Sequence, residues 1–174
     1  SDLIAPAIES FIGLIEGGDS DVVMERLAEV GGRAAGHFRS LLGQLSKRGA
    51  TMEVIWPGPR GVRQVTLTNR RAGELAETLT YVEEKTEGHY VWGVLNGALK
   101  RKGYFELQAD SGEVYSGSIS PEIMQDLRDF FDRRCRAFIV TTEVHDHATN
   151  RKKTHHRLLE LAEPEELTEA DDEM

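Results

Sequence analysis

The 174-residue chain lacks a second cysteine, long apolar runs and a surplus of positive charge. Its single cysteine, Cys135, excludes an intramolecular disulfide and favours a reducing compartment. No apolar stretch approaches the roughly 18 residues of a membrane span, and no charged-then-apolar leader precedes a cleavage site. These absences predict a cytoplasmic protein with no membrane-embedded part.

Acidic residues outnumber basic ones by 30 to 21, which gives a net charge of −9. The segment AEPEELTEADDEM at residues 162–174 holds seven of the acids and no base, so the remaining chain carries only −2. Such a run is typical of a solvated segment, and we predict an acidic disordered tail over 162–174. Because the rest of the chain is nearly neutral, the overall charge does not exclude a nucleic-acid partner.

The first 48 residues carry apolar side chains at helical spacing. A first helix is predicted over residues 3–15, and Gly17-Gly18 ends it. Asp19-Ser20-Asp21 supplies capping residues for a second helix, which Gly31-Gly32 is expected to break or bend. Because the first helix is apolar over a wide face, we expect residues 1–48 to pack internally, to self-associate or to bind a partner protein.

Two strands and one helix complete the first part of the chain. TMEVIW (51–56) and VRQVTL (62–67) are predicted strands around a turn rich in proline and glycine. A further helix is predicted over residues 69–85. Residues 1–86 are therefore predicted to form a helical module with one β-hairpin, in the order α-α-β-β-α.

Short strands dominate the second part of the chain. Three are predicted at 89–99, 104–109 and 113–119, joined by the turn sequences KRKG and DSG. Ser120-Pro121-Glu122 is typical of a helix start, since it supplies a capping hydroxyl, a proline at the first helical position and an acid. The segments CRAFIVTTEVHDH and THHRLLEL then form a final hairpin, which gives the order β-β-β-α-β-β.

This order resembles that of an OB-fold, a small five-stranded Greek-key barrel, over residues 88–161. Gly93 and Gly97 lie in its first strand, where a small barrel needs a sharp bend. An SH3-like barrel and a plain α+β sheet are the alternatives. The predicted fold class is α+β, with a helical α-α-β-β-α part followed by a five-stranded OB-like β-barrel over residues 87–161.

The final hairpin contains a histidine-rich stretch, HDHATNRKKTHHR, at residues 145–157. Strand alternation places three of its histidines on the outer face of the barrel: His145, His147 and His156. The residues expected to face the barrel interior are Phe138, Val140, Val144, Leu159 and Leu161. Two registers satisfy this pattern, one with a loop over 148–151 and one with a loop over 148–153.

Only the register with the longer loop brings the three imidazoles together. They are weak candidate metal ligands, because no cysteine is available beside them. No metal and no other cofactor is expected. A histidine acid–base pair for RNA cleavage is a second interpretation, because imidazole transfers protons near neutral pH. A solvated hairpin tip and a nucleic-acid contact are the remaining interpretations. No nucleophile–base arrangement is recognisable elsewhere, so an enzymatic function is not favoured.

Two predicted loops of the barrel carry three cations each. In an OB-like topology, the loops between strands one and two and between strands four and five flank the face that commonly binds oligonucleotides. Here they supply Lys100, Arg101 and Lys102, and Arg151, Lys152 and Lys153, with Arg157 nearby. The aromatic residues expected to stack on bases are Tyr104, Tyr115, and Tyr90 or Trp92.

These features predict a non-enzymatic protein whose OB-like barrel binds single-stranded or structured nucleic acid through the two basic loops and Tyr104. A protein–protein adaptor or dimerisation module without a nucleic-acid role is the alternative hypothesis. A histidine-dependent ribonuclease is the third.

Overall fold

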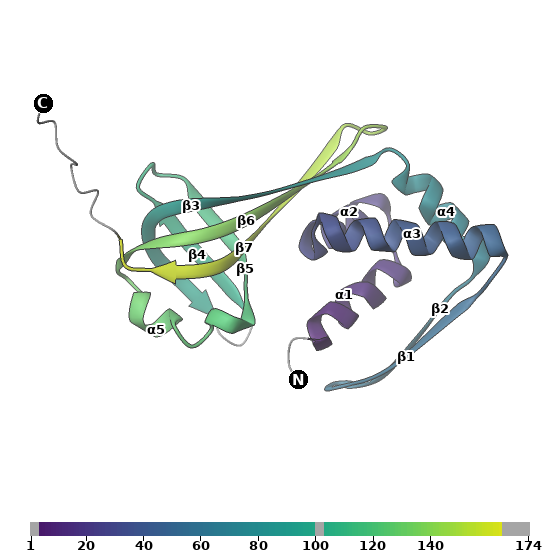
Figure 1. Ribbon diagram of the computed structural model, residues 1–174, viewed down its shortest axis with the longest axis horizontal. Coiled ribbons are helices and arrows are strands. Elements are labelled where there is room, and N and C mark those ends of the chain that lie inside the picture. Colours follow the sequence, from purple (N-terminus) through teal and green to yellow (C-terminus); the bar gives the residue numbers. More distant parts are fainter. Residues whose placement is uncertain (1–3, 100–102, 165–174) are drawn as a thin grey trace, which may run out of the picture. The chain divides into compact units, whose positions relative to one another are not determined.

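The computed structural model describes residues 4–99 and 103–164, which fold as two compact units (Figure 1). The helical unit contains the chain up to Thr86 and Thr142–His155, and the barrel unit contains Glu87–Thr141 and the chain from His156 onward. The sequence-based division had assigned 142–155 to the barrel. In the structure these residues pack with the helices, since Val144 belongs to the core of the helical unit.

The elements of the helical unit, in chain order, are α1 (Ile4–Glu16), α2 (Ser20–Val30), α3 (Gly32–Arg48), β1 (Met52–Gly58), β2 (Gly61–Leu67) and α4 (Asn69–Leu79). The predicted second helix is broken into α2 and α3, because Gly31 adopts a φ of 83° between them. Asp19 caps α2 by accepting a hydrogen bond from the backbone N–H of Val22 at 3.1 Å.

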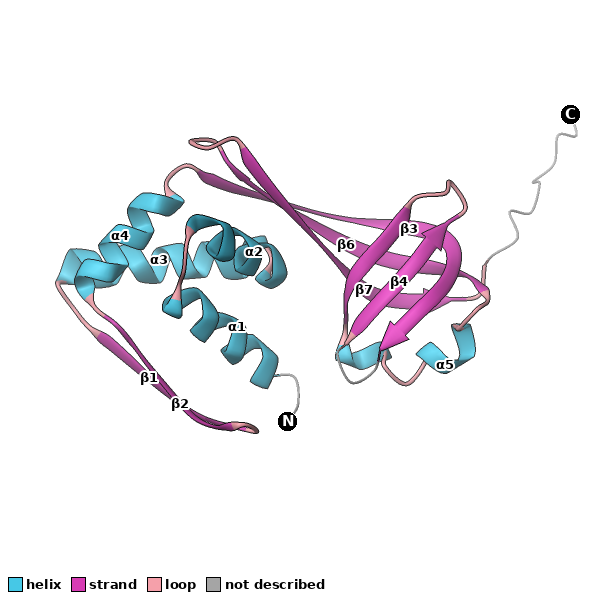
Figure 2. Cartoon of the chain, turned by 180° about the vertical axis from the view of Figure 1, so that it is seen from behind, coloured by secondary structure: helices cyan, strands magenta, loops and turns pink. Residues whose placement is uncertain are grey.

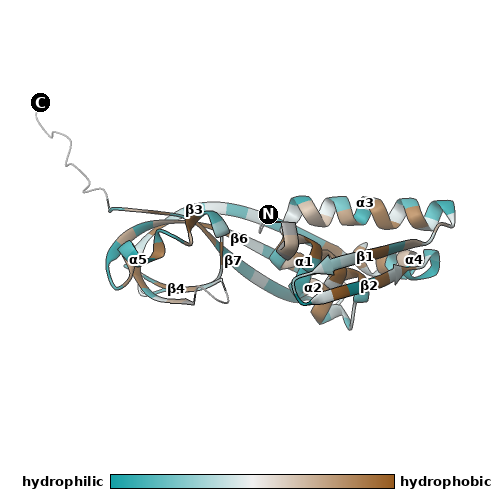
Figure 3. Ribbon diagram, turned by 90° about the horizontal axis from the view of Figure 1, so that it is seen from below, coloured by the Kyte–Doolittle hydropathy of each residue, from teal (hydrophilic) through white to brown (hydrophobic). Residues whose placement is uncertain are grey.

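The core of the helical unit lies between its helices and the inner face of the β1–β2 hairpin. Polar and apolar residues alternate around α3 (Figure 3), and its apolar stripe buries Ala35, Phe38 and Leu42. The edge of the Phe11 ring in α1 meets the ring of Phe38, with the centroids 5.9 Å apart. No helix within the described residues is long and apolar enough to cross a membrane.

Helix α4 ends at Leu79, and not near residue 85 as predicted. Strand β3 (Val82–Leu99) begins three residues later. The helix prediction extended too far because Val82 continues the apolar spacing of α4, whereas its side chain reaches the same core from a strand. The carbonyl of Tyr81 accepts a hydrogen bond from the N–H of His147 at 2.8 Å, which ties this segment to the tip of the last hairpin.

The barrel unit is a closed five-stranded mixed barrel with the strand order β3-β4-β5-β7-β6 (Figure 2). The further elements are β4 (Tyr104–Ala109), β5 (Val114–Ile119), the 3₁₀ helix η1 (Pro121–Ile123), α5 (Leu127–Phe130), β6 (Arg134–Asp146) and β7 (Arg151–Ala162). Strands β3, β4 and β5 pair antiparallel, and β5 pairs parallel with β7. This arrangement confirms the predicted α+β fold with an OB-like β-β-β-α-β-β barrel.

Two glycines allow the barrel backbones to approach closely. A Cβ on Gly93 would lie 2.2 Å from the carbonyl oxygen of Gln108, and a Cβ on Gly117 would lie 2.0 Å from that of His156. Gly97 follows an irregularity in the β3–β4 pairing, between Leu95 and Gly97. The prediction that β3 bends at glycines is consistent with this geometry.

The predicted inward face of the last two strands was wrong at Phe138, Val140 and Leu159, whereas Leu161 packs against the barrel core as predicted. On β6 the buried residues are Cys135, Ala137 and Ile139, whereas Phe138 and Val140 are half-buried. On β7 Leu158 is fully buried, and Leu159 is half-buried. Each strand has apolar residues at adjacent positions, so alternation alone does not select a face.

The buried positions of β6 shift by one residue where the strand passes from the barrel unit into the helical unit. Up to Ile139 the odd-numbered residues are buried, and from Thr142 onward the even-numbered ones are. Val144 is therefore buried as predicted, but in the core of the helical unit. One strand thus contributes to two separate cores.

Candidate functional site

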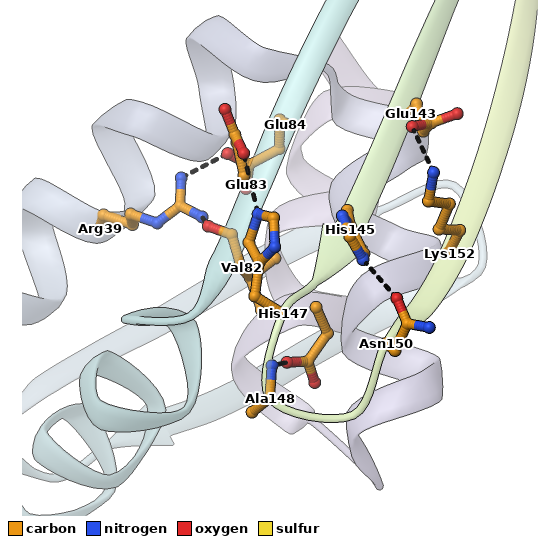
Figure 4. A network of polar contacts seen from close by, with 11 residues as sticks. Arg39, Val82, Glu83, Glu84, Glu143, His145, His147, Ala148, Asn150 and Lys152 are labelled. Carbon is orange, nitrogen blue, oxygen red and sulfur yellow. Dashed lines mark hydrogen bonds and ion pairs between the residues drawn. The ribbon is translucent and has the colours of Figure 1, made fainter.

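The tip of the β6–β7 hairpin is a polar network within the helical unit (Figure 4). A guanidinium nitrogen of Arg151 lies 2.9 Å from a carboxylate oxygen of Asp21 in α2. The Nζ of Lys152 lies 3.6 Å from Glu143 Oε1. Two of the three cations that this loop was predicted to offer to phosphates therefore already face carboxylates of the chain itself.

The two histidines of the tip lie next to each other, with ring centroids 4.1 Å apart (Figure 4). His145 Nε2 is 3.1 Å from Asn150 Oδ1, and His147 Nε2 is 2.9 Å from Glu83 Oε2. The hydrogen bond from His147 holds the pKa of Glu83 below its usual value. Each imidazole thus has a polar side chain within hydrogen-bond distance.

The predicted group of three histidines is not assembled as a metal site. Strand β6 ends at Asp146 and β7 begins at Arg151, so the turn spans 147–150 and matches neither predicted loop. His156 belongs to the barrel unit, whereas His145 and His147 belong to the helical unit. Within residues 4–99 and 103–164, no group of three or more His, Cys, Asp or Glu side chains is placed to hold a metal ion.

Two predicted site residues share one row on the outer face of the barrel. Tyr104 on β4 pairs with Ser118 on β5, and Ser118 pairs with Arg157 on β7. Tyr104 and Arg157 are both exposed, and each has a fully buried neighbour, Phe105 and Leu158, that points into the barrel. Because neighbouring strands lie about 4.8 Å apart, the row places a phenol and a guanidinium roughly 10 Å apart.

The predicted basic loop Lys100–Lys102 lies outside the described residues. Gly103 follows it with a φ of 58° and leads directly into Tyr104. Of the second predicted loop, Lys153 is half-buried in the helical unit.

Strands β3 and β6 carry a second aromatic group on the outer face of the barrel. Tyr90 and Trp92 on β3 are 51% and 37% exposed, and their ring centroids are 6.3 Å apart. The ring of Phe138 on β6 lies 5.0 Å from that of Tyr90, and the guanidinium carbon of Arg136 lies 5.2 Å from the centroid of the Tyr90 ring. Tyr90 or Trp92 was predicted to stack on bases, whereas no binding role was predicted for Arg136 or Phe138.

One end of the barrel core is closed by polar side chains at interior-facing positions. The ring of Tyr115 lies between those of His89 and His156, with centroid distances of 5.6 Å and 5.1 Å. Burial lowers the pKa of His156, with a further contribution from the charge of His89, and burial raises the pKa of Tyr115. The Tyr115 hydroxyl donates to Glu113 Oε2 at 2.9 Å.

This polar group was not predicted. His156 was expected on the outer face, whereas its pairing with Gly117 and the buried position of Leu158 place it on the inner side. His89 was not predicted as a site residue, because it lies far from the other histidines in the sequence. Its position two residues before the buried Val91 is the signal that could have placed it at the end of the core.

No known protein-family model, curated protein or solved structure matches this chain.

Proposed function

We propose that the barrel unit binds single-stranded or structured nucleic acid and does not catalyse a reaction on it. The observation that carries this proposal is the row of Tyr104, Ser118 and Arg157. In the sequence, only Gly103 separates this row from the cations Lys100, Arg101 and Lys102. An exposed aromatic ring and an exposed guanidinium on adjacent strands suit a ligand with both planar bases and phosphates. Closed barrels of OB-like topology offer this kind of face.

The phosphate contacts would come from Lys100, Arg101 and Lys102 and from Arg157. Arg151 and Lys152 would add contacts only by exchanging their carboxylate partners, Asp21 and Glu143, for phosphates. Lys153 is half-buried and offers less of its side chain to a ligand. Arg157 has no ion pair of this kind among those found in the described residues. The proposal therefore ranks Lys100–Lys102 and Arg157 above the tip of the hairpin.

Titration of labelled single-stranded RNA and DNA by fluorescence anisotropy tests this function. Replacing Lys100, Arg101 and Lys102 together by alanine should weaken binding, because three phosphate contacts are lost. Arg60→Ala is the matched control, since Arg60 is an exposed cation in the β1–β2 turn of the helical unit. Equal affinity of the triple variant and the wild type would contradict the assignment of this loop.

A second candidate function is protein binding or self-association through the helical unit. Residues of the β1–β2 hairpin alternate between a buried face and an exposed face. On the exposed face, Ile55 is 58% exposed and Val62 is 71% exposed. Sedimentation of the wild type and of Ile55→Thr would show whether this surface joins two copies. Dimerisation that is lost in Ile55→Thr, without any nucleic-acid binding, would favour this function over the first.

The ribonuclease hypothesis makes a separate prediction. A histidine acid–base pair would cleave RNA but not DNA, because the 2′-hydroxyl is the nucleophile in such a reaction. RNA that stays intact after long incubation with the protein would rule this hypothesis out. Cleavage that is lost in His156→Ala or His145→Ala would support it against our proposal.

A further inference from the structure

The outer face of β3 and β6 carries a group of planar side chains that the basic loops do not explain. We call the side chains of Tyr90, Trp92, Arg136 and Phe138 the β3–β6 platform. Tyr90 and Trp92 alternate with the buried residues Val91 and Gly93, so they point away from the barrel core. Large aromatic side chains are normally buried in a protein core. Where several are exposed together, they indicate a binding surface.

Neighbouring groups hold the platform in place. A Cβ on Gly88 would lie 2.5 Å from Cζ of Phe138, so the Phe138 ring lies directly over the glycine backbone. The Arg136 guanidinium, 5.2 Å from the Tyr90 centroid, forms a cation–π contact with that ring. The Tyr90 ring is thus supported by Phe138 and Arg136 and retains half of its surface in solvent.

The platform is continuous with the face proposed above. Strand β3 pairs with β4 in the barrel, and the N–H of Asp110, next to the end of β4, donates to the carbonyl of Trp92 at 2.8 Å. Trp92 therefore lies beside one end of β4, and Tyr104 lies at the other end. At about 3.3 Å per residue, these ends are roughly 20 Å apart, a distance that a few nucleotides of extended single strand can span.

We propose that the β3–β6 platform stacks unpaired bases of a single-stranded nucleic acid that runs along β3 and β4 from the row of Tyr104. This inference rests on the proposed function and assigns its base-binding site. Aromatic faces stack on any base, whereas the Lys100–Lys102 loop contacts only phosphates. Between the two ends, the side chains of Asn96 and Gln108 share a hydrogen bond of 3.3 Å.

The path also passes a negative charge. Glu106 lies on the outer side of β4, between the buried residues Phe105 and Leu107. A phosphodiester chain along β4 would pass near this carboxylate, so Glu106→Gln should tighten binding. A ligand that contacted only the loops would not respond to this substitution.

Fluorescence anisotropy with labelled oligothymidine and oligouridine of about 12 nucleotides tests the platform on the full-length chain, since such a length fits one OB-type barrel. Trp92→Ala and Tyr90→Ala should each weaken binding roughly 5- to 100-fold, the usual effect of losing one stacked base. Trp92→Phe should restore most of the affinity, because it retains a ring. Tyr81→Ala is the matched control, since Tyr81 is 58% exposed in the helical unit.

Three measurements on a folded platform do not depend on truncating one of its side chains. Trp56→Phe leaves Trp92 as the sole tryptophan, and its fluorescence should be quenched when a base stacks on it. The same oligonucleotide without bases should bind the wild type at least roughly fivefold more weakly. Polyglutamate, which offers charge but no rings, should not displace oligothymidine at equal charge concentration.

The outcomes separate this inference from the function on which it rests. Wild-type protein that binds neither oligonucleotide at low salt would overturn both. A second outcome would overturn the platform alone. In it, the Lys100–Lys102 variant binds more weakly than the wild type, whereas Trp92→Ala and Tyr90→Ala bind as tightly as the wild type. The strand without bases would also bind as tightly as the normal strand. Displacement by polyglutamate together with unquenched Trp92 would point to a polypeptide ligand and would also overturn it.

Discussion

Thr141 Oγ1 and His156 Nδ1 share a hydrogen bond of 2.8 Å at one end of the barrel core. Both side chains lie at interior-facing positions, because Thr141 is two residues after the buried Ile139 and His156 is two residues before the buried Leu158. The hydrogen bond satisfies an imidazole that has lost much of its contact with water. Burial at this end of the core favours the neutral form of His156 and lowers its pKa.

The stability of the barrel should fall in mild acid. Burial and the neighbouring His89 lower the pKa of His156 in the folded chain, and Glu113 partly opposes this effect. The unfolded chain then binds the proton more readily, so the stabilisation present above pH 6.5 is lost as the pH falls below that value. Urea unfolding at pH 7.5 and at pH 5.0 should show a lower midpoint in acid.

Substitution of His156 tests the source of this pH dependence. His156→Gln should make the two midpoints more alike, because glutamine does not titrate. His37→Gln on α3 removes an exposed histidine of the helical unit and should leave the difference unchanged. If His156→Gln keeps the same difference between the two midpoints, groups other than His156 cause the pH dependence.

A side chain at Gly117 or Gly93 should open the barrel. Alanine at either position would place its Cβ about 2 Å from a backbone oxygen of the adjacent strand. Backbone has to move to relieve such a contact, and we expect the free energy of unfolding to fall by about 2–4 kcal/mol. Gly36→Ala in α3 is the opposite case, since no atom lies within 4 Å of the new Cβ. It should raise stability by about 0.5–1 kcal/mol, and equal effects at Gly36 and Gly117 would contradict the barrel closure.

Cys135 should be inert in the folded protein. Its side chain is fully buried in the barrel core, and burial raises the pKa of the thiol to about 11. Only the thiolate reacts with iodoacetamide, so folded protein at pH 8 should stay unmodified by mass spectrometry while urea-unfolded protein gains one adduct. Rapid modification without urea would show that the barrel opens readily at β6.

The two basic loops should differ in their contribution to the salt dependence of binding. Each lost phosphate contact lowers the slope of log affinity against log salt by about 0.7 for a single strand, so alanine at Lys100, Arg101 and Lys102 should lower it by about 2. Alanine at Arg151, Lys152 and Lys153 should lower it by less, because Asp21 and Glu143 already compete for the first two. A larger effect from the second loop would reverse this ranking.

Much of the fold could be predicted because its signals are local. Asp19 caps α2, Gly31 ends it, and Pro121 begins the short helical segment between β5 and β6, as their positions in the sequence indicate. The OB-like barrel was predicted from the succession of strands along the chain and from the helix start between the third and fourth of them. Each of these features depends on a few neighbouring residues, so one sequence is enough to predict it.

The site was harder to predict because it depends on which unit each residue joins. The β6–β7 hairpin appeared to be one element, yet its tip packs with the helices, and the buried face of β6 changes between Ile139 and Thr142. Alternation within one strand cannot reveal such a change. For the same reason, Arg151 and Lys152 were expected beside the barrel, although their carboxylate partners belong to the helical unit.

Titration of the full-length protein against labelled single-stranded RNA and DNA at two salt concentrations tests the central claim most directly. We predict saturable binding at about 50 mM salt that weakens by an order of magnitude or more at about 200 mM, because several phosphate contacts are lost together. No binding at the lower salt concentration to either RNA or DNA would contradict the account.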